Sequence, residues 1–90
     1  MTELTIENAK KITPGQVVKF YLIDKHGNPY NEIGVVFANN HLGIYCNRED
    51  NGYFFFGYMM FNGKIKFEIL DEHSPVAIYS MGYDFVSKHE

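Results

Sequence analysis

The sequence predicts an all-β protein, a small curled antiparallel barrel or sandwich of five to seven strands. Hydrophobic residues make up 46 % of the chain and aromatic residues 17 %, and strand-forming Phe, Tyr, Val and Ile are frequent. Short stretches of alternating apolar and polar residues are separated by Gly, Pro and Asn turn signals. Several of these stretches are apolar on both faces, and a flat sheet cannot bury two faces, so we expect the sheet to curl.

The first fifteen residues predict a short peripheral element followed by a turn. Leu4 and Ile6 alternate with polar residues, which fits a short edge strand, and a single helical turn over residues 7–11 is the alternative. Pro14-Gly15 predicts the centre of a type II turn, because Gly tolerates the positive φ that this turn requires at its second central residue.

Residues 16–24 predict a strand with Val18, Phe20 and Leu22 on one face. The next stretch, residues 25–32, is polar and rich in turn-forming residues. Its Gly27-Asn28-Pro29 centre is not expected to continue a strand, because Pro cannot donate a ladder hydrogen bond. We therefore expect residues 25–32 to form a loop that folds over one end of the sheet.

Residues 33–38 and 41–47 predict a hairpin that turns at Asn39-Asn40. This register places one apolar set opposite another, with Ile33, Val35 and Phe37 facing Cys46, Ile44 and Leu42. The other face holds small residues, among them Gly34 and Gly43. These glycines indicate either a large side chain packed close to the strands or a sharp bend.

Residues 52–70 predict the main hairpin, with a type I′ turn at Asn62-Gly63. This register places Phe61 opposite Lys64, and it pairs Met60 with Ile65, Tyr58 with Phe67 and Phe56 with Ile69. The second strand of this hairpin alternates, with Ile65, Phe67 and Ile69 on the apolar face.

The polar face of the main hairpin carries unexpected apolar residues, which we call the outward stripe: Tyr53, Phe55, Met59 and Phe61. The termini or a second sheet of the same barrel are two candidates to cover it. The third is a protein partner or a second copy of the chain, since aromatic residues and Met are enriched at the centres of interfaces. Lys64, Lys66 and Glu68 would then form the polar rim of this partner-binding surface.

The C-terminal residues predict a last strand over residues 76–80 that closes the sheet. A helix is the alternative, with Ser74-Pro75 at its start and Gly82 at its end. We expect a single domain over residues 1–90, with its core between about residues 16 and 80; the sequence leaves open whether residues 1–12 and 81–90 belong to that core.

Two resemblances are visible. A long first loop and then three strands with short turns resembles the SH3-like barrel, and an OB-type barrel is the second candidate. The segment Asn51 to Tyr58 resembles the RNP1 pattern of RRM and cold-shock proteins, in which aromatic side chains stack on bases. Gly52, Tyr53, Phe55 and Tyr58 match that pattern, but Asn51 replaces its basic residue and Phe54 replaces a small residue.

Composition argues against several classes of function. The single cysteine, Cys46, allows neither an intramolecular disulfide nor a cysteine zinc site, and the four histidines have no metal-site spacing. Glu72, His73 and Ser74 are residue types of a catalytic triad, but neighbours on an extended chain point to opposite faces. No glycine-rich phosphate cradle is present. We therefore expect no enzyme activity, no cofactor and no metal.

Charge and targeting signals point to a cytoplasmic protein without a membrane role. A net charge of −3 and a pI near 5.7 disfavour a dedicated duplex binder. No apolar run is long enough to span a bilayer, and the N-terminus lacks the apolar region of a secretory signal.

The sequence therefore favours a non-enzymatic protein-binding module that uses the outward stripe, either with a protein partner or as a homodimer. Many small acidic inhibitors and adaptors of phage or mobile-element type share this profile. Single-stranded nucleic-acid binding by stacking on Tyr53, Phe55 and Tyr58 is the alternative.

Overall fold

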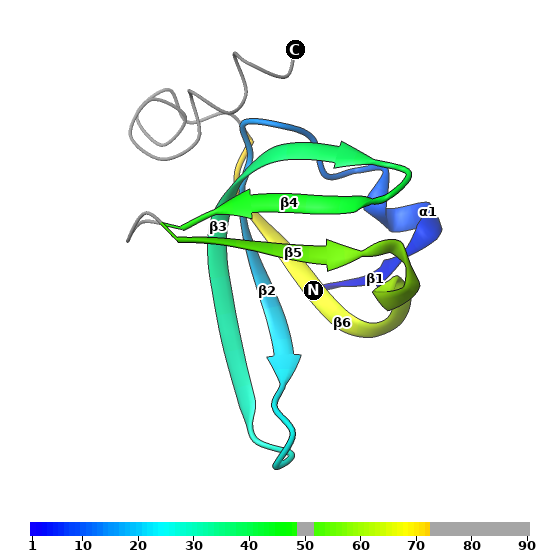
Figure 1. Ribbon diagram of the computed structural model, residues 1–90, viewed down its shortest axis with the longest axis vertical. Helices are drawn as coiled ribbons and strands as arrows, with labels where there is room; N and C mark the ends of the chain where they lie inside the picture. Colours follow the sequence, from blue (N-terminus) through cyan, green and yellow to red (C-terminus); the bar gives the residue numbers. More distant parts are fainter. Residues whose placement is uncertain (49–51, 73–90) are drawn as a thin grey trace.

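The computed structural model of the protein describes residues 1–48 and 52–72, and it is mainly β (Figure 1). The elements in chain order are β1 (Thr2–Thr5), α1 (Ile6–Ala9), β2 (Val17–Ile23), β3 (Pro29–Asn40), β4 (Gly43–Asn47), β5 (Tyr53–Gly57), the 3₁₀ helix η1 (Tyr58–Met60) and β6 (Asn62–Asp71). The predicted all-β class is confirmed. The predicted strand at residues 76–80 lies outside the described residues.

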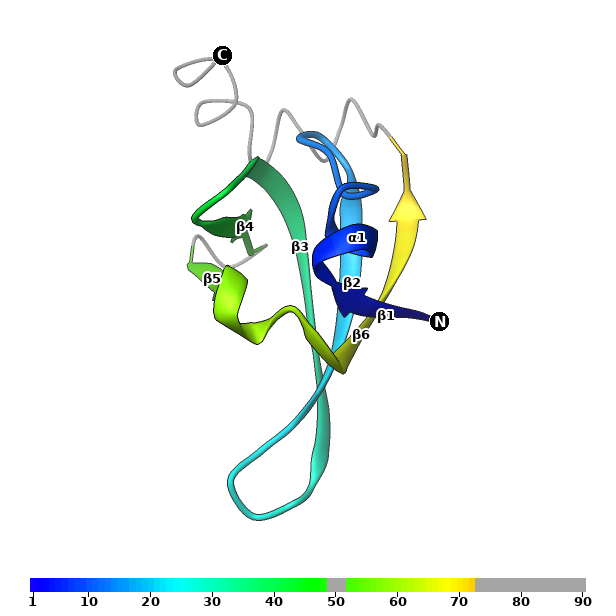
Figure 2. The same ribbon diagram turned by 90° about the vertical axis from the view of Figure 1, so that its right-hand side faces the viewer.

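The described strands form one antiparallel sheet in the order β1-β6-β2-β3-β4-β5. The sheet curls, so that β4 and β5 face β6 and β1 across the core (Figure 2). Leu4 of β1 and Phe56 of β5 belong to the same buried cluster although their strands are the two edges of the sheet. The edges do not pair, and the described sheet is therefore curled but not closed into the barrel that the sequence predicted.

The N-terminal segment contains both of the elements that the sequence offered as alternatives. Strand β1 is followed directly by α1, because the Thr5 side chain accepts a hydrogen bond from the Asn8 N–H at 3.1 Å and caps the helix. The turn at Pro14-Gly15 is confirmed, with a φ of 94° at Gly15. Leu4, Ala9 and Ile12 are buried in the main cluster, so this segment contributes to the core.

Strands β2 and β3 form a long arm that extends beyond the rest of the molecule (Figure 1). The alternation predicted for β2 is confirmed, but the loop predicted over residues 25–32 is wrong, since pairing continues as far as Ile23 and Pro29. The turn is compact because the Asp24 carboxylate accepts the N–H groups of His26 and Asn28 at 2.8 and 2.9 Å. Pro29 is tolerated because it is the first residue of its strand.

The hairpin of β3 and β4 is confirmed, but its predicted register is wrong. Val36 lies opposite Cys46, and Val35 lies opposite Asn47 rather than Ile44. The turn lies at residues 41–42 rather than 39–40, and the register shifts by one residue at a bulge between Val36 and Ala38. The Asn40 side chain fixes this turn by accepting the Leu42 N–H at 2.8 Å.

The predicted main hairpin is wrong, because β5 and β6 do not pair with each other. Strand β5 pairs with β4, whereas β6 lies between β1 and β2. The chain leaves β5 through η1, where the Phe61 N–H donates to the Tyr58 carbonyl at 3.0 Å, and crosses to the other side of the curled sheet. Asn62-Gly63 therefore begins β6 opposite Thr5 instead of forming a hairpin turn, although Gly63 has the expected positive φ of 84°.

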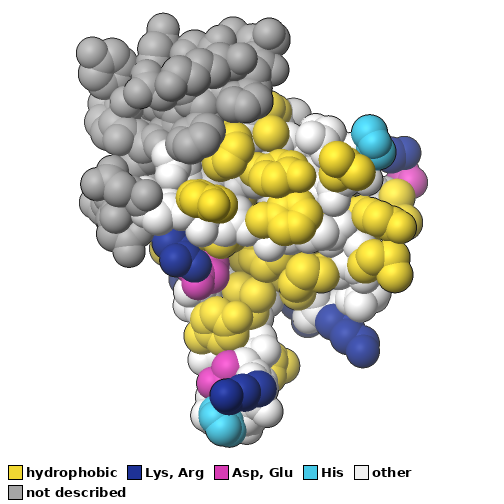
Figure 3. Space-filling model, viewed as in Figure 1, with side chains coloured by type: hydrophobic (Ala, Val, Ile, Leu, Met, Phe, Trp, Pro, Cys, Tyr) yellow, Lys and Arg dark blue, Asp and Glu magenta, His cyan; other side chains and the backbone are white. Residues whose placement is uncertain are grey.

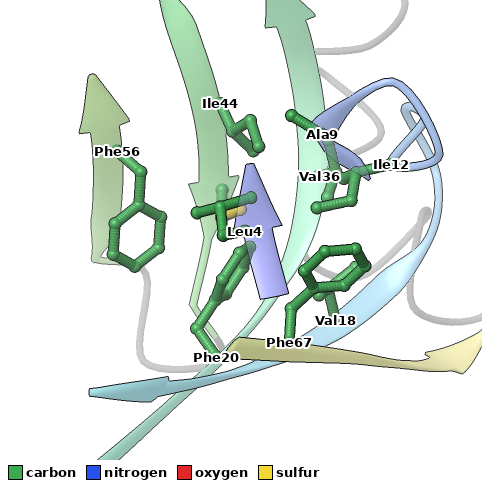
Figure 4. Packing of buried hydrophobic residues seen from close by; sticks show 10 residues of the cluster. Leu4, Ala9, Ile12, Val18, Phe20, Val36, Ile44, Phe56 and Phe67 are labelled. Carbon is green, nitrogen blue, oxygen red and sulfur yellow. The ribbon is translucent and has the colours of Figure 1, made fainter. Parts of the chain in front are cut away.

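The core lies inside the curl and is centred on Phe20 of β2 (Figure 4). Its ring centroid lies 4.5 Å from that of Phe56, 6.0 Å from that of Phe54 and 6.4 Å from that of Phe67. Cys46 is part of the same cluster, and burial raises the pKa of its thiol.

No helix in the described part of the chain is long and apolar enough to cross a membrane.

Candidate functional site: an aromatic patch beside the edge strand β5

Strand β5 presents alternate aromatic side chains to the two faces of the sheet. Phe54 and Phe56 pack on the inner face against Phe20, whereas Tyr53 and Phe55 project from the outer face. Tyr53 is 69 % exposed and Phe55 is 46 % exposed. The predicted outward direction of these two side chains is confirmed, because the alternation of a strand does not depend on which neighbour it pairs with.

Neighbouring strands add two more rings to this outer face. Tyr45 of β4 lies directly opposite Phe55, with ring centroids 4.6 Å apart and planes inclined by 31°. Phe37 of β3 lies next in the row, 5.9 Å from Tyr45. We call Phe37, Tyr45, Tyr53 and Phe55 the aromatic patch. Hydrophobic side chains gather on this face of the molecule over β4 and β5 (Figure 3).

Sequence reasoning missed Phe37 and Tyr45 as members of the patch. It assigned Phe37 to the inner face opposite Leu42, and the bulge between Val36 and Ala38 reverses that assignment. A bulge has little sequence signature of its own. The pairing of Tyr45 with Phe55 could have been expected from the frequent pairing of aromatic residues across strands.

The glycines of β3 and β4 allow the aromatic rings to approach the backbone closely. A Cβ atom at Gly43 would overlap the ring of Phe55 and the carbonyl oxygen of Phe56. A Cβ atom at Gly34 would lie 2.8 Å from the ring of Phe54 and 2.8 Å from the carbonyl oxygen of Asn47. Large side chains do pack against these glycines, but the prediction that both glycines share one face is wrong, because Gly34 contacts the inward ring of Phe54 and Gly43 the outward ring of Phe55.

The remaining residues of the predicted partner-binding surface lie elsewhere. Met59 is on η1 and is 75 % exposed, whereas Phe61 turns inward and packs against the core cluster. Lys64, Lys66 and Glu68 are exposed on β6, and β2, β3 and β4 separate that strand from β5. The structure therefore keeps Tyr53 and Phe55 together but does not place the predicted polar rim beside them, because the hairpin that would have joined them does not form.

The RNP1-like residues are also separated. Tyr53 and Phe55 belong to the aromatic patch, but Tyr58 lies on η1. Arg48, the cation nearest to β5 in the sequence, forms a two-point ion pair with Glu32, with N···O distances of 2.9 and 3.1 Å. Its guanidinium lies 5.2 Å from the centroid of the inward-facing Phe54 ring. The geometry therefore supplies stacking surfaces without a free guanidinium from Arg48 to bind phosphate.

The backbone of β5 is the second feature of the site. One side of β5 pairs with β4 over five residue pairs, and no other described strand pairs with its outer side. The strand carries no charged residue and no proline, which are common features that prevent an edge strand from accepting another strand. The site therefore combines apolar contact with backbone groups of β5 that no second described strand uses for hydrogen bonding.

The described residues contain no group of three or more His, Cys, Asp and Glu side chains that could hold a metal ion. Comparison of the chain with protein-family models, with curated proteins and with solved structures gives no significant match. The aromatic patch and the edge of β5 are the features of the described residues that bear on function.

Proposed function

We propose that the protein is a non-enzymatic binding module whose aromatic patch and β5 edge bind a second copy of the chain. The observation that carries this proposal is the position of Tyr53 and Phe55, which are exposed on an uncharged edge strand. Strand addition at such an edge supplies backbone hydrogen bonds, and the neighbouring side chains supply apolar contact.

The sequence of β5 suits antiparallel pairing with itself about a two-fold axis. Phe55 is the central residue of Tyr53–Gly57, so an axis through it places Phe55 beside Phe55 of the second copy. The same register places each Tyr53 opposite Gly57, where an aromatic ring can cover the backbone of a glycine. The rows of rings formed by Phe37, Tyr45 and Phe55 in the two copies would then be continuous.

The expected dimer is weak. An aromatic side chain offers about 200 Å², so exposed fractions of 69 % and 46 % leave roughly 230 Å² on Tyr53 and Phe55 of each copy. Together the two copies bury roughly 460 Å² of these side chains, against about 1,200–2,000 Å² for a standard stable interface. We therefore expect a reversible dimer that depends on protein concentration.

A charge-exchange experiment tests the proposed axis. Phe55→Lys should give a monomer, because the two introduced ammonium groups would lie side by side across the axis. Phe55→Glu should also give a monomer, and an equimolar mixture of the two variants should recover the dimer. Ile33→Lys and Ile33→Glu form the matched control, since Ile33 lies on central strand β3 and is 47 % exposed.

The measurement is sedimentation velocity of the full chain between about 10 and 500 µM. A dimer that the Phe55 variants lose singly and regain when mixed supports the proposal. A wild-type monomer over the whole range refutes it, as does a dimer that the Phe55 and Ile33 variants affect equally. An apolar interface should persist or tighten at high salt, whereas single-stranded nucleic acid, the other partner considered for these rings, would be released.

We also retain an SH3-like layout as a proposal for the fold. Its support is the consecutive pairing of β2, β3, β4 and β5 and the return of β6 beside β2. Whether the protein acts as an inhibitor or adaptor of phage type stays a hypothesis of the same kind.

A further inference from the structure

A pocket of about 550 Å³ lies between α1, the turn that joins β3 to β4, and η1. Part of its apolar lining comes from the N-terminal segment, with Ile6 and Ala9 of α1 and the following Ile12. The rest includes Tyr58, the first residue of η1, and Phe61, the residue after η1. A volume of this size with a mostly apolar lining is typical of sites for small molecules. None of the residues of the aromatic patch lines it, so the pocket is separate from the proposed self-association site.

The wall formed by α1 is held firmly against β3. The Asn39 side chain donates hydrogen bonds to the carbonyl oxygens of Ala9 and Ile12, at 2.8 and 2.6 Å. Next to this wall, the buried Gln16 side chain accepts the Thr13 N–H at 2.8 Å. These bonds satisfy backbone groups at the end of the short helix, and they hold this one wall of the pocket in place.

The charged group in the lining of the pocket is the ammonium of Lys10. Lys10 and His41 are exposed side chains that contribute to its lining, and no Asp or Glu is among the lining residues. The ion pair found among the described residues is that of Arg48 and Glu32, which lie outside the lining. Within residues 1–48 and 52–72, no acidic side chain forms an ion pair with the ammonium group of Lys10, which can therefore pair with a ligand.

We propose that this pocket binds an apolar monocarboxylate of medium chain length. The hydrocarbon chain would contact Ile6, Tyr58 and Phe61, and the carboxylate would pair with the ammonium of Lys10 and hydrogen-bond to His41. Since a water molecule takes about 30 Å³ of liquid volume, 550 Å³ has room for roughly 18 non-hydrogen atoms. A saturated chain of about ten carbons therefore fits without filling the pocket completely.

The test is a titration of the ¹⁵N-labelled full chain with decanoate below its micelle concentration, followed by amide chemical shifts. We expect saturable shifts confined to α1, residues 39–42 and residues 58–61. Octanoate should bind about tenfold more weakly, because two methylene groups fewer are removed from water. Decanol, which has the chain without the charge, should bind more weakly than decanoate.

Two matched pairs of variants separate a specific site from general adsorption. Lys10→Gln should weaken decanoate binding about threefold, as expected for an exposed ion pair, whereas Lys11→Gln should have no effect because Lys11 does not line the pocket. Ile6→Ser should weaken binding, whereas Met59→Ser should not. Ile6 and Met59 are 63 % and 75 % exposed, so neither substitution empties the core.

Three results would overturn the proposal: shifts that do not saturate, equal binding of decanoate and decanol, or equal effects of Lys10→Gln and Lys11→Gln. Binding of a peptide with an apolar C-terminal residue, without binding of decanoate, would also overturn it and would identify the pocket as a peptide-docking site. None of these variants alters β5, so the result is independent of the self-association experiment.

Discussion

Gly43 determines how closely β5 can approach β4, and its replacement by Ala tests the construction of the aromatic patch. Its φ is 154°, a value that residues with a Cβ atom rarely adopt, and strain of this kind costs about 1–3 kcal/mol. An added Cβ atom would also overlap the carbonyl oxygen of Phe56, which is backbone and cannot rotate away. Strand β5 would have to move outward from β4.

The cost of Gly43→Ala follows from these two effects. Loss of one or two ladder hydrogen bonds adds about 1–2 kcal/mol to the strain, so we expect a total of about 2–5 kcal/mol. Gly27→Ala is the matched control, since Gly27 also has a positive φ, 84°, but its added Cβ atom would meet nothing within 4 Å. Strain alone should cost about 1–2 kcal/mol there.

Urea unfolding followed by circular dichroism measures both variants. For a domain of this size, m is about 1 kcal/mol/M or slightly more, so the midpoint of Gly43→Ala should lie roughly 2 M below that of Gly27→Ala. Gly43→Ala should also lose any self-association, because β5 no longer holds Phe55 beside Tyr45. Equal midpoints for the two variants would show that β4 and β5 are not packed through Gly43, and the geometry of the aromatic patch would be refuted.

Two further predictions concern the core. Phe20→Ala should lower the free energy of unfolding by about 3–5 kcal/mol, because Phe20 is fully buried and contacts three other rings. Phe20→Leu should lower it by only about 1 kcal/mol. Equal losses for the two variants in urea titrations would contradict the central position of this ring. Burial raises the pKa of the Cys46 thiol, so the thiol stays neutral in the folded protein while the unfolded thiol ionises above about pH 8.5. The free energy of unfolding should therefore fall as pH rises through that value, by up to about 1.4 kcal/mol per pH unit. Cys46→Ala should remove this pH dependence. If Cys46→Ala has the same pH dependence as the wild type, the burial of the thiol is contradicted.

Much of the secondary structure could be predicted, because it depends on local patterns. The alternation in residues 17–23 and the turn at Pro14-Gly15 are encoded within a few residues, and both are present in the structure. The directions of Tyr53 and Phe55 followed from the same alternation. These features need no knowledge of which strand lies next to which.

Strand partners could not be predicted, because they depend on contacts between distant segments. Asn62-Gly63 is a strong local signal for a hairpin, and Gly63 does take a positive φ, but η1 carries the chain across the curl before β6 begins. Burial of Phe67 beside Phe20 of β2 outweighs the local turn preference. The predicted polar rim on β6 was separated from Tyr53 for this reason.

The pocket had no signal in the sequence. It is assembled from α1, the β3–β4 turn and the η1 crossing, and two hydrogen bonds from Asn39 join the first two of these segments. Lys10 and His41 line the same pocket only because β3 returns to the side of α1. A cation at the mouth of an apolar pocket is therefore a property of the folded chain alone.

The position of β6 between β1 and β2 has a consequence for biosynthesis. Thr2 pairs with Phe67, so the strand that leaves the ribosome early has no neighbour in the sheet until some sixty residues later have been made. At about 5–20 residues per second, that delay is several seconds. Strands β2, β3 and β4 pair in sequence order and can assemble during this interval, whereas β1 can pair only after β6 has been added to β2. The amino-terminal part of the sheet is thus the last to become native during translation.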